Sequence, residues 1–257
     1  MSGHRPRKRF GQHFLHERGV IDRIVRTLAP RSGERVVEIG PGQGALTEAL
    51  LDEVEHLDAV ELDRDLIAEL SSRWPAARLT LHPYDALEMD FTGLAGPDEP
   101  LRLTGNLPYN ISTPLIFHLL ETPHAIRDMH FMLQREVVER LTAEPGTRDW
   151  SRLSVMVQYH CRADFVFGVP PGAFTPPPQV HSAVVRLVPR EAEPAAQDYA
   201  RFVDLVRQAF SQRRKAVRNS LKSRLATEQM RGAGVDPGLR PDQLTVADYV
   251  ALANITT

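Results

Sequence analysis

The chain has 257 residues, enough for a full α/β core and a small additional domain. Its hydrophobic content of 42% and charged content of 25% are typical of a globular protein, and no apolar run reaches the ~18 residues of a membrane-spanning helix. A single cysteine, Cys161, excludes an intrachain disulfide and a zinc site of paired cysteines, so we expect a cytoplasmic protein that holds no metal.

Positive charge is unevenly distributed along the chain, although the formal net charge at pH 7 is only −2. Basic residues gather near the N-terminus, where no apolar stretch follows them as it would in a secretory signal. A second basic group lies late in the chain and comprises Arg213, Arg214, Lys215, Arg218, Lys222 and Arg224. Such a group is typical of a solvated helix face or of a nucleic-acid contact, and charge alone does not separate the two.

From residue 35 onward, short apolar runs alternate with amphipathic segments. The apolar runs predict strands over residues 35–40, 57–61, 79–82, 101–104 and 129–133, and the amphipathic segments predict helices over 45–54, 65–74 and 113–121. This alternation is typical of βαβ units and a parallel sheet. The β-rich runs 163–169 and 182–188 have no helix between them. They predict an antiparallel hairpin at the sheet edge, interrupted by a proline-rich loop at 170–178.

The composition changes after residue 190. A polar, alanine-rich linker over residues 191–197 precedes three segments of helical periodicity, at 199–210, 213–225 and 241–254. We therefore expect two domains, a Rossmann-like α/β domain over residues 1–190 and a small all-helical domain over residues 191–257.

A glycine-rich loop, Glu38-Ile-Gly-Pro-Gly-Gln-Gly44, follows the first predicted strand and precedes a helix. Glycines in that place permit a tight turn and let a ligand approach main-chain N–H groups at the helix N-terminus. Glu61 ends the second predicted strand, where a carboxylate can bind the hydroxyls of a ribose. The loop also fits the dinucleotide fingerprint GxGxxA, so NAD binding and a purely structural turn both stay open.

Two acidic residues favour S-adenosylmethionine over NAD. Glu38, directly before the glycines, is typical of methyltransferases, where it organises the loop near the methionine moiety. Asp85 follows the third predicted strand and is placed to accept a hydrogen bond from an adenine amine, although an aspartate in a turn is more often only a turn residue.

The tetrapeptide Asn106-Leu-Pro-Tyr109 follows the fourth predicted strand. The side-chain carbonyl of Asn106 and the main-chain carbonyl of Leu107 can accept the two hydrogens of an adenine amine, which favours a more nucleophilic nitrogen. Pro108 fixes the backbone, and Tyr109 offers a face on which an extruded base can stack. Methyl transfer to an adenine amine needs mainly alignment of nitrogen, methyl and sulfur, so we expect no strong general base.

The chain closely resembles the bacterial small-subunit (16S) ribosomal RNA adenine dimethyltransferases, the KsgA/RsmA family. The resemblance runs almost from end to end and rests on the glycine-rich loop and on these segments: Lys8-Arg-Phe-Gly-Gln-His-Phe-Leu15, Gly105-Asn-Leu-Pro-Tyr-Asn-Ile-Ser112, Arg152-Leu-Ser-Val-Met156, Phe174-Thr-Pro-Pro-Pro-Gln-Val-His-Ser182, Gln212-Arg-Arg-Lys215 and Arg218-Asn-Ser-Leu221. It implies a class I methyltransferase sheet with a C-terminal helical domain, S-adenosylmethionine as cofactor, and dimethylation of two adjacent adenines near the 3′ end of the small-subunit RNA.

The resemblance also implies roles for individual residues. The predicted catalytic residues are Asn106, Leu107, Pro108, Tyr109 and Phe174, with Phe174 flanking the base. The predicted cofactor-binding residues are Gln12, His13, Phe14, Leu15, Glu38, Gly40, Gly42, Gly44, Glu61, Leu62, Asp85, Ala86 and Asn106. The predicted RNA-binding residues are Arg213, Arg214, Lys215, Arg218 and Lys222.

Two positions depart from the family pattern. Trp150-Ser151 stands where Tyr-Gly is common, which we expect to alter a loop facing RNA, and His13 stands where Asn is common, which we expect to change little. Neither departure affects the predicted catalytic residues.

The expected partner is small-subunit RNA in immature 30S-type particles, bound by a monomer without metal or membrane. Three alternatives stay open. The first is the same chemistry on large-subunit RNA, against which the C-terminal domain and the Phe174 loop argue. The second is a ribosome-assembly factor that acts mainly by binding. The third is an NAD-dependent oxidoreductase, for which no acid or base suited to hydride transfer is evident.

Overall fold

The structure is a computed structural model that describes residues 13–96 and 99–255. The chain divides into two compact units, which we call unit 1 (Met1–Val138 and Asp164–Pro189) and unit 2 (Glu139–Ala163 and Arg190–Thr257). Residues Glu139–Ala163 thus group with the C-terminal helices. The boundary at residue 190 as a division between functional domains stays a prediction.

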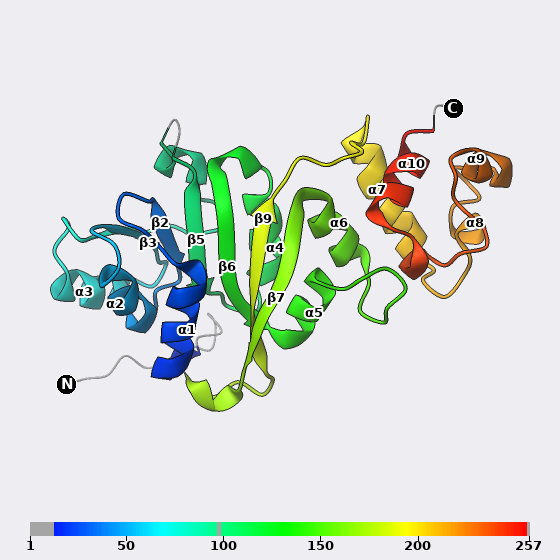
Figure 1. The fold of residues 1–257 in the computed structure, drawn as a ribbon. Coiled ribbons are helices and arrows are strands. Elements are labelled where there is room, and N and C mark those ends of the chain that lie inside the picture. The colour runs from blue at the N-terminus through cyan, green and yellow to red at the C-terminus, as the bar shows by residue number, and fades with distance from the viewer. Residues whose placement is uncertain (1–12, 97–98, 256–257) are drawn as a thin grey trace. The chain divides into compact units, whose positions relative to one another are not determined.

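Unit 1 is built on a seven-stranded sheet in the order β4-β3-β2-β5-β6-β9-β7 (Figure 1). The strands are β2 Val36–Ile39, β3 Leu57–Val60, β4 Leu79–His82, β5 Leu101–Asn106, β6 Ile126–Gln134, β7 Cys161–Val169 and β9 Ser182–Pro189. Strands β2 to β6 pair in parallel and β9 pairs antiparallel with β6. This arrangement confirms the predicted Rossmann-like sheet.

Helices cover both faces of this sheet, with α1 in front of it and α4 behind it in Figure 1. The helices that follow the strands are α1 Arg18–Leu28, α2 Ala45–Leu51, α3 Arg64–Arg73, α4 Ser112–Leu119 and α5 Arg135–Leu141, with short 3₁₀ turns η2 Phe91–Leu94, η3 Pro123–Ala125 and η4 Pro171–Ala173. No described helix is long and apolar enough to cross a membrane.

Helix α1 was not predicted, although its sequence carries the signal. Ile21, Ile24, Val25 and Leu28 recur at helical spacing and are all buried in the main hydrophobic core. Glu17 caps the start of this helix, because its carboxylate accepts hydrogen bonds from the main-chain N–H groups of Gly19 and Val20.

A separate two-stranded sheet joins the N-terminal segment to the proline-rich loop. Its strands, β1 Phe14–Leu15 and β8 Phe174–Thr175, pair antiparallel, with Leu15 opposite Phe174. The side chain of Phe174 is 2% exposed and packs into the main core of unit 1.

Unit 2 is helical. Its helices are α6 Arg152–His160, α7 Tyr199–Phe210, α8 Val217–Ser220, α9 Thr227–Gly232 and α10 Val246–Ala253, with the 3₁₀ turn η5 Pro241–Gln243. Helices α6, α7 and α10 pack on one another around the buried side chains of Phe202 and Tyr249. The polar groups of two buried aromatic side chains both have hydrogen-bond partners. The Trp150 indole N–H donates to the Leu244 carbonyl at 3.0 Å, and the Tyr249 hydroxyl donates to the Pro241 carbonyl at 2.7 Å.

The predicted helix over residues 213–225 was wrong. Residues 211–215 form turns, and only Val217–Ser220 are helical. The main-chain N–H groups of Val217 and Arg218 donate to the carbonyls of Leu239 and Pro237 rather than to the preceding helical turn. Tertiary hydrogen bonds therefore override a local helical preference here.

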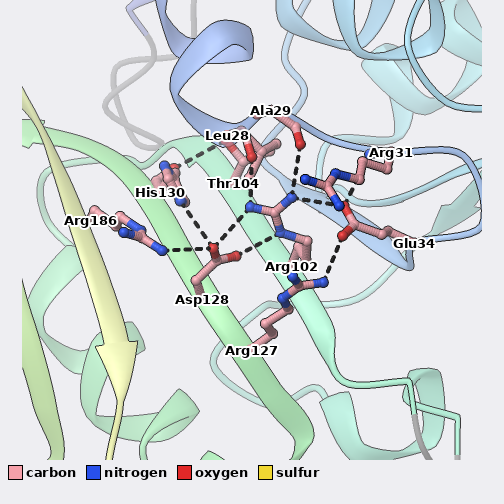
Figure 2. A network of polar contacts seen from close by, with 10 residues as sticks. All are labelled: Leu28, Ala29, Arg31, Glu34, Arg102, Thr104, Arg127, Asp128, His130 and Arg186. Carbon is pink, nitrogen blue, oxygen red and sulfur yellow. Dashed lines mark hydrogen bonds and ion pairs between the residues drawn. The ribbon is translucent and has the colours of Figure 1, made fainter.

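A buried ionic network ties the amino ends of β5 and β6 to the end of α1 (Figure 2). Arg102 on β5 faces Asp128 on β6 in register and binds both of its carboxylate oxygens at 2.9 Å. Its remaining donors bind Glu34 at 2.8 Å and the carbonyls of Leu28 and Ala29 at 2.6 and 3.2 Å. All five N–H donors of this guanidinium therefore have an acceptor.

Asp128 is held as an anion within this network. Burial alone would raise the pKa of its carboxyl, but hydrogen bonds from His130 and Arg102 outweigh burial and hold the pKa well below its usual range. Because the folded-state pKa is depressed, Asp128 contributes stability above the unfolded-state pKa and loses it as the pH falls toward the folded-state value.

We predict that Asp128→Asn lowers the free energy of unfolding at pH 7 by about 3 kcal/mol, since it leaves the buried Arg102 charge incompletely paired. The difference from the wild type should shrink as the pH falls below about 4, where the unfolded carboxyl of Asp128 is protonated. Urea unfolding at several pH values measures this.

The matched control is Asp22→Asn, which breaks an exposed ion pair between Arg18 and Asp22 on α1. Exposed pairs contribute little, so this variant should be close to the wild type at each pH. Equal effects of the two substitutions at pH 7 would contradict the assigned role of the network.

Candidate active site

A cleft of about 680 Å³, including its open mouth, lies in unit 1 where the predicted cofactor and catalytic segments meet. It is reached from the carboxyl ends of β2, β3 and β5, the usual place for a ligand in an open α/β sheet. Its lining residues are His13, Phe14, Leu15, Glu38, Gly40, Pro41, Gly42, Gln43, Ala45, Leu46, Glu61, Leu66, Asn106, Leu107, Pro108 and Tyr109.

Two glycines beside the cleft, one in the glycine-rich loop and one on β5, lie where a side chain would crowd a neighbouring segment. Gly42 has a φ of +56°, and a Cβ atom there would lie 3.0 Å from the ring of Phe14. At Gly105, directly before the predicted catalytic segment, a Cβ atom would lie 2.2 Å from the Ile39 carbonyl oxygen. These glycines let the N-terminal segment approach the loop and let β5 lie close to β2.

Glu38 is a fully buried carboxyl at the floor of the cleft. It accepts a 2.6 Å hydrogen bond from the Thr47 hydroxyl. Burial raises the pKa of Glu38 to about 7, against the lowering effect of the Thr47 hydrogen bond and with a smaller rise from the nearby Glu61 carboxylate. A small change in its surroundings therefore changes its charge near neutral pH.

Glu61 is oriented by the backbone around it. Its carboxylate accepts main-chain hydrogen bonds from Leu62 and Asp63 at 2.9 Å each, and from Gly42 at 3.4 Å. Burial raises the pKa of Glu61, although these three N–H groups act in the opposite direction. The carboxylate thus joins the end of β3 to the glycine-rich loop that follows β2.

Asn106 is oriented by the N-terminal segment. Its side-chain NH₂ donates to the His13 carbonyl oxygen at 2.8 Å. Because a carbonyl only accepts, this contact fixes the amide orientation and leaves Asn106 Oδ1 as an acceptor. The main-chain N–H of Leu107 donates to the Met132 carbonyl at 3.2 Å, which fixes the turn that begins there.

Tyr109 is held at its hydroxyl and on one face. Its hydroxyl forms a 2.7 Å hydrogen bond with the Ser182 hydroxyl on β9, and burial raises the pKa of this phenol despite that bond. The imidazole of His13 stacks on the ring, with the centroids 5.8 Å apart and the planes inclined by 27°.

Most predicted cofactor and catalytic residues meet in this cleft, but five do not line it. Gly44 caps the start of α2, where a Cβ atom would meet Leu70 and Trp74. Leu62 is 48% exposed beyond β3, Asp85 accepts a turn hydrogen bond from the Leu87 N–H at 3.0 Å, and Ala86 and Phe174 are buried. The roles of these residues stay predictions.

Gln12 lies outside the described residues. Other members of the site were not predicted, namely Pro41, Gln43, Ala45, Leu46 and Leu66 in the lining and Ser182 beside Tyr109. Proximity to the glycine-rich loop could have indicated the first four. Ser182 ends one of the segments that carry the family resemblance, but no local pattern indicates its contact with Tyr109, which lies 73 residues away along the chain.

The predicted RNA-binding cations lie in unit 2 and differ in their contacts. Arg213 is engaged within the unit, by an ion pair with Asp242 at 3.4 Å and a hydrogen bond to the Arg148 carbonyl. Four others, Arg214, Lys215, Arg218 and Lys222, are exposed and make no ion pair with any described residue. Of the five predicted RNA-binding residues, these four are therefore available to contact a polyanion.

The described part of the chain contains neither a cluster of metal-ligating side chains nor a reactive thiol. No group of three or more histidine, cysteine, aspartate or glutamate side chains there is placed to hold a metal ion. Burial raises the pKa of the Cys161 thiol to about 12, which keeps it protonated and unreactive.

The family model described as Ribosomal RNA adenine dimethylase matches residues 3–257. A protein of Alcanivorax borkumensis named Ribosomal RNA small subunit methyltransferase A is 64% identical over 257 residues, which cover all of this chain and 92% of that protein. A protein of the same name from Pseudomonas aeruginosa is 58% identical, covering 98% of this chain and 94% of its own length.

Two solved structures are similar over nearly the whole chain. A dimethyladenosine transferase from Plasmodium falciparum superposes with a TM-score of 0.77 at 26% identity, covering 93% of this chain and 96% of that one. The 23S rRNA methyltransferase ErmE gives a TM-score of 0.75 at 28% identity, covering 93% and 98%. These likenesses confirm the resemblance read from the sequence motifs. The chain is a methyltransferase that belongs to the ribosomal RNA adenine dimethylase family.

Proposed function

We propose that the protein uses S-adenosylmethionine to dimethylate the exocyclic amines of two adjacent adenines near the 3′ end of small-subunit ribosomal RNA. The observation that carries the proposal is the meeting of the Asn106–Tyr109 segment with Glu38 and Glu61 in one cleft. We also infer that it acts as a cytoplasmic monomer, without metal, on immature 30S-type particles.

The charge of the cleft supports this cofactor. Two carboxyl groups, Glu38 and Glu61, line the cleft, and no lysine or arginine is among its described lining residues. S-adenosylmethionine carries a positive sulfonium and an ammonium group, whereas the pyrophosphate of NAD is anionic and would face these carboxylates. The electrostatics therefore favour S-adenosylmethionine.

The residues present also fit the parts of this cofactor. The oriented carboxylate of Glu61 is a suitable acceptor for two ribose hydroxyls, and the glycine-rich loop with Glu38 would hold the methionine end. Asp85 remains our proposal for the adenine amine. When bound, the cofactor supplies a methyl group on a positively charged sulfur that is a good leaving group.

The substrate base would be held by three neighbouring groups. Oδ1 of Asn106, kept free by the contact of its NH₂ with His13, would accept one amine hydrogen, and the Leu107 carbonyl would accept the other. Tyr109 would stack on the base, an interaction worth roughly 1–3 kcal/mol. These contacts position the nitrogen for in-line attack, so catalysis comes mainly from alignment.

The identity of the RNA follows from the relatives. Proteins named for the small subunit are 64% and 58% identical to this chain, whereas the large-subunit enzyme ErmE is 28% identical. Small-subunit RNA is therefore the preferred substrate in our proposal, and Arg214, Lys215, Arg218 and Lys222 of unit 2 would bind its phosphates.

Asn106→Ala should reduce methyl transfer to undermethylated small subunits by about 100-fold or more, because it removes an acceptor that aligns the amine. Transfer of label from S-adenosylmethionine measures the rate, and filter binding measures RNA affinity. RNA affinity should stay near the wild-type value. Full activity of the variant would refute the proposed role of Asn106.

Binding of S-adenosylmethionine should strengthen as the pH rises from about 6 to 8, by up to about tenfold. The reason is that the pKa of Glu38 is raised to about 7 in the free protein, so a cationic ligand binds best once this carboxyl has lost its proton. Isothermal titration calorimetry at several pH values checks this.

Glu38→Gln should abolish the Glu38 part of that pH dependence, while titration of the ligand itself remains in both proteins. The free protein gives a second readout. Since the folded-state pKa of Glu38 is raised, its contribution to stability is lost as the pH rises through 7, and the Gln variant should not show this loss. Identical pH profiles for variant and wild type would count against Glu38 as the titrating group.

Reversing the charges of Arg214 and Lys215 together to Glu should weaken RNA binding and lower its salt dependence, leaving cofactor affinity unchanged. A matched control is Arg231→Glu, an exposed arginine of unit 2 that lies near Glu228 on α9. An equal loss of RNA affinity in both variants, or a loss of cofactor affinity in the variant of Arg214 and Lys215, would contradict this prediction.

A further inference from the structure

The side chain of His13 contacts two segments that are distant in the sequence. Its Nδ1 lies 2.7 Å from the carbonyl oxygen of Pro176 in the proline-rich loop, and its ring stacks on Tyr109. Because a carbonyl only accepts, Nδ1 carries the proton and donates it. The imidazole is thus fixed at one end by the proline-rich loop and lies with its face on Tyr109.

The stacking of His13 restricts how a base can lie on Tyr109. Its hydroxyl is bound to Ser182 at 2.7 Å, and His13 covers one face of the ring. A base that stacks on Tyr109 must therefore use the opposite face, and the ring behind it is held in position. The same residue orients Asn106, through its main-chain carbonyl.

The first and second methyl transfers differ in the number of hydrogen bonds that the adenine amine can form. In each transfer the amine lone pair forms an N–C bond while the C–S bond breaks with its electrons going to sulfur, and the ammonium product releases a proton to water. An unmodified adenine amine has two hydrogens for the acceptors on Asn106 and Leu107. The monomethylated amine has one, so one acceptor loses its partner and stacking must hold the base for the second transfer.

We propose that His13 is a positioning residue that fixes the ring of Tyr109 and thereby sustains the second methyl transfer. The inference rests on the proposed function, because it assumes an adenine on Tyr109. This role differs from the cofactor binding expected of His13. Here the imidazole acts by holding Tyr109 in place, and its effect is on whether the product is monomethylated or dimethylated adenine.

The test compares His13→Ala, His13→Asn and the wild type on undermethylated small subunits. Mass spectrometry of the RNA nucleosides follows monomethyladenine and dimethyladenine with time, which gives the rate of each transfer. His13→Ala should slow the second transfer about tenfold more than the first, so that monomethyladenine accumulates. His13→Asn should restore most of the dimethyladenine, since a planar amide can donate to Pro176 and lie against Tyr109.

The matched control is His56→Ala. His56 also lies in unit 1 and its Nδ1 contacts a main-chain carbonyl, that of Ala77 at 3.2 Å, but it does not line the cleft. Its variant should give the wild-type product ratio. Cofactor affinity and the unfolding midpoint are measured for every variant, so that a loss of cofactor binding or of folding is recognised.

The inference is overturned if His13→Ala slows both transfers equally, or if His13→Asn is no better than His13→Ala. Failure of the proposed function gives a different result, because the wild type would then form no methylated adenine in small-subunit RNA. An active wild type with an unchanged product ratio in His13→Ala overturns the role of His13 alone.

Discussion

The guanidinium of Arg102 joins the parts of unit 1 on which the cleft depends. It binds the Asp128 carboxylate across β5 and β6, Glu34 before β2, and two carbonyls at the end of α1. Helix α1 directly follows the segment that carries His13 and Phe14, so its position determines how that segment covers the glycine-rich loop. This ionic network lies at the amino end of β5, and Asn106 lies at the other end of the strand. The ionic network and the candidate active site therefore lie at opposite ends of β5.

The cleft combines two kinds of polar group, which suit different ligands. Glu38 and Glu61 are carboxyl groups whose pKa values are raised by burial, in a lining without lysine or arginine, which suits a cationic cofactor. The oxygens of Asn106 and Leu107 are neutral acceptors, which suit an uncharged amine. In the proposed reaction a neutral nucleophile would meet a cationic methyl donor, which requires no strong base.

The sequence was sufficient to predict the features that are local along the chain. Strand β4 and helix α7 match their predicted ranges, and the glycine-rich loop and the Asn106–Tyr109 segment meet in the cleft as expected. Long-range features were not predictable. The pairing of β1 with β8 and the contact of Tyr109 with Ser182 join segments that are distant along the chain, and no local pattern indicates that they meet. The helix expected over 213–225 is interrupted because the N–H groups of residues 217 and 218 donate to the carbonyls of residues 239 and 237.

The most direct test of the proposed activity is to map the methylated sites. Purified protein and labelled S-adenosylmethionine are incubated with undermethylated small subunits, with naked small-subunit RNA and large subunits as controls, and the modified positions are located by primer extension. We expect label confined to two adjacent adenines near the 3′ end of small-subunit RNA. Label in large-subunit RNA, or no label despite normal cofactor binding, would contradict it.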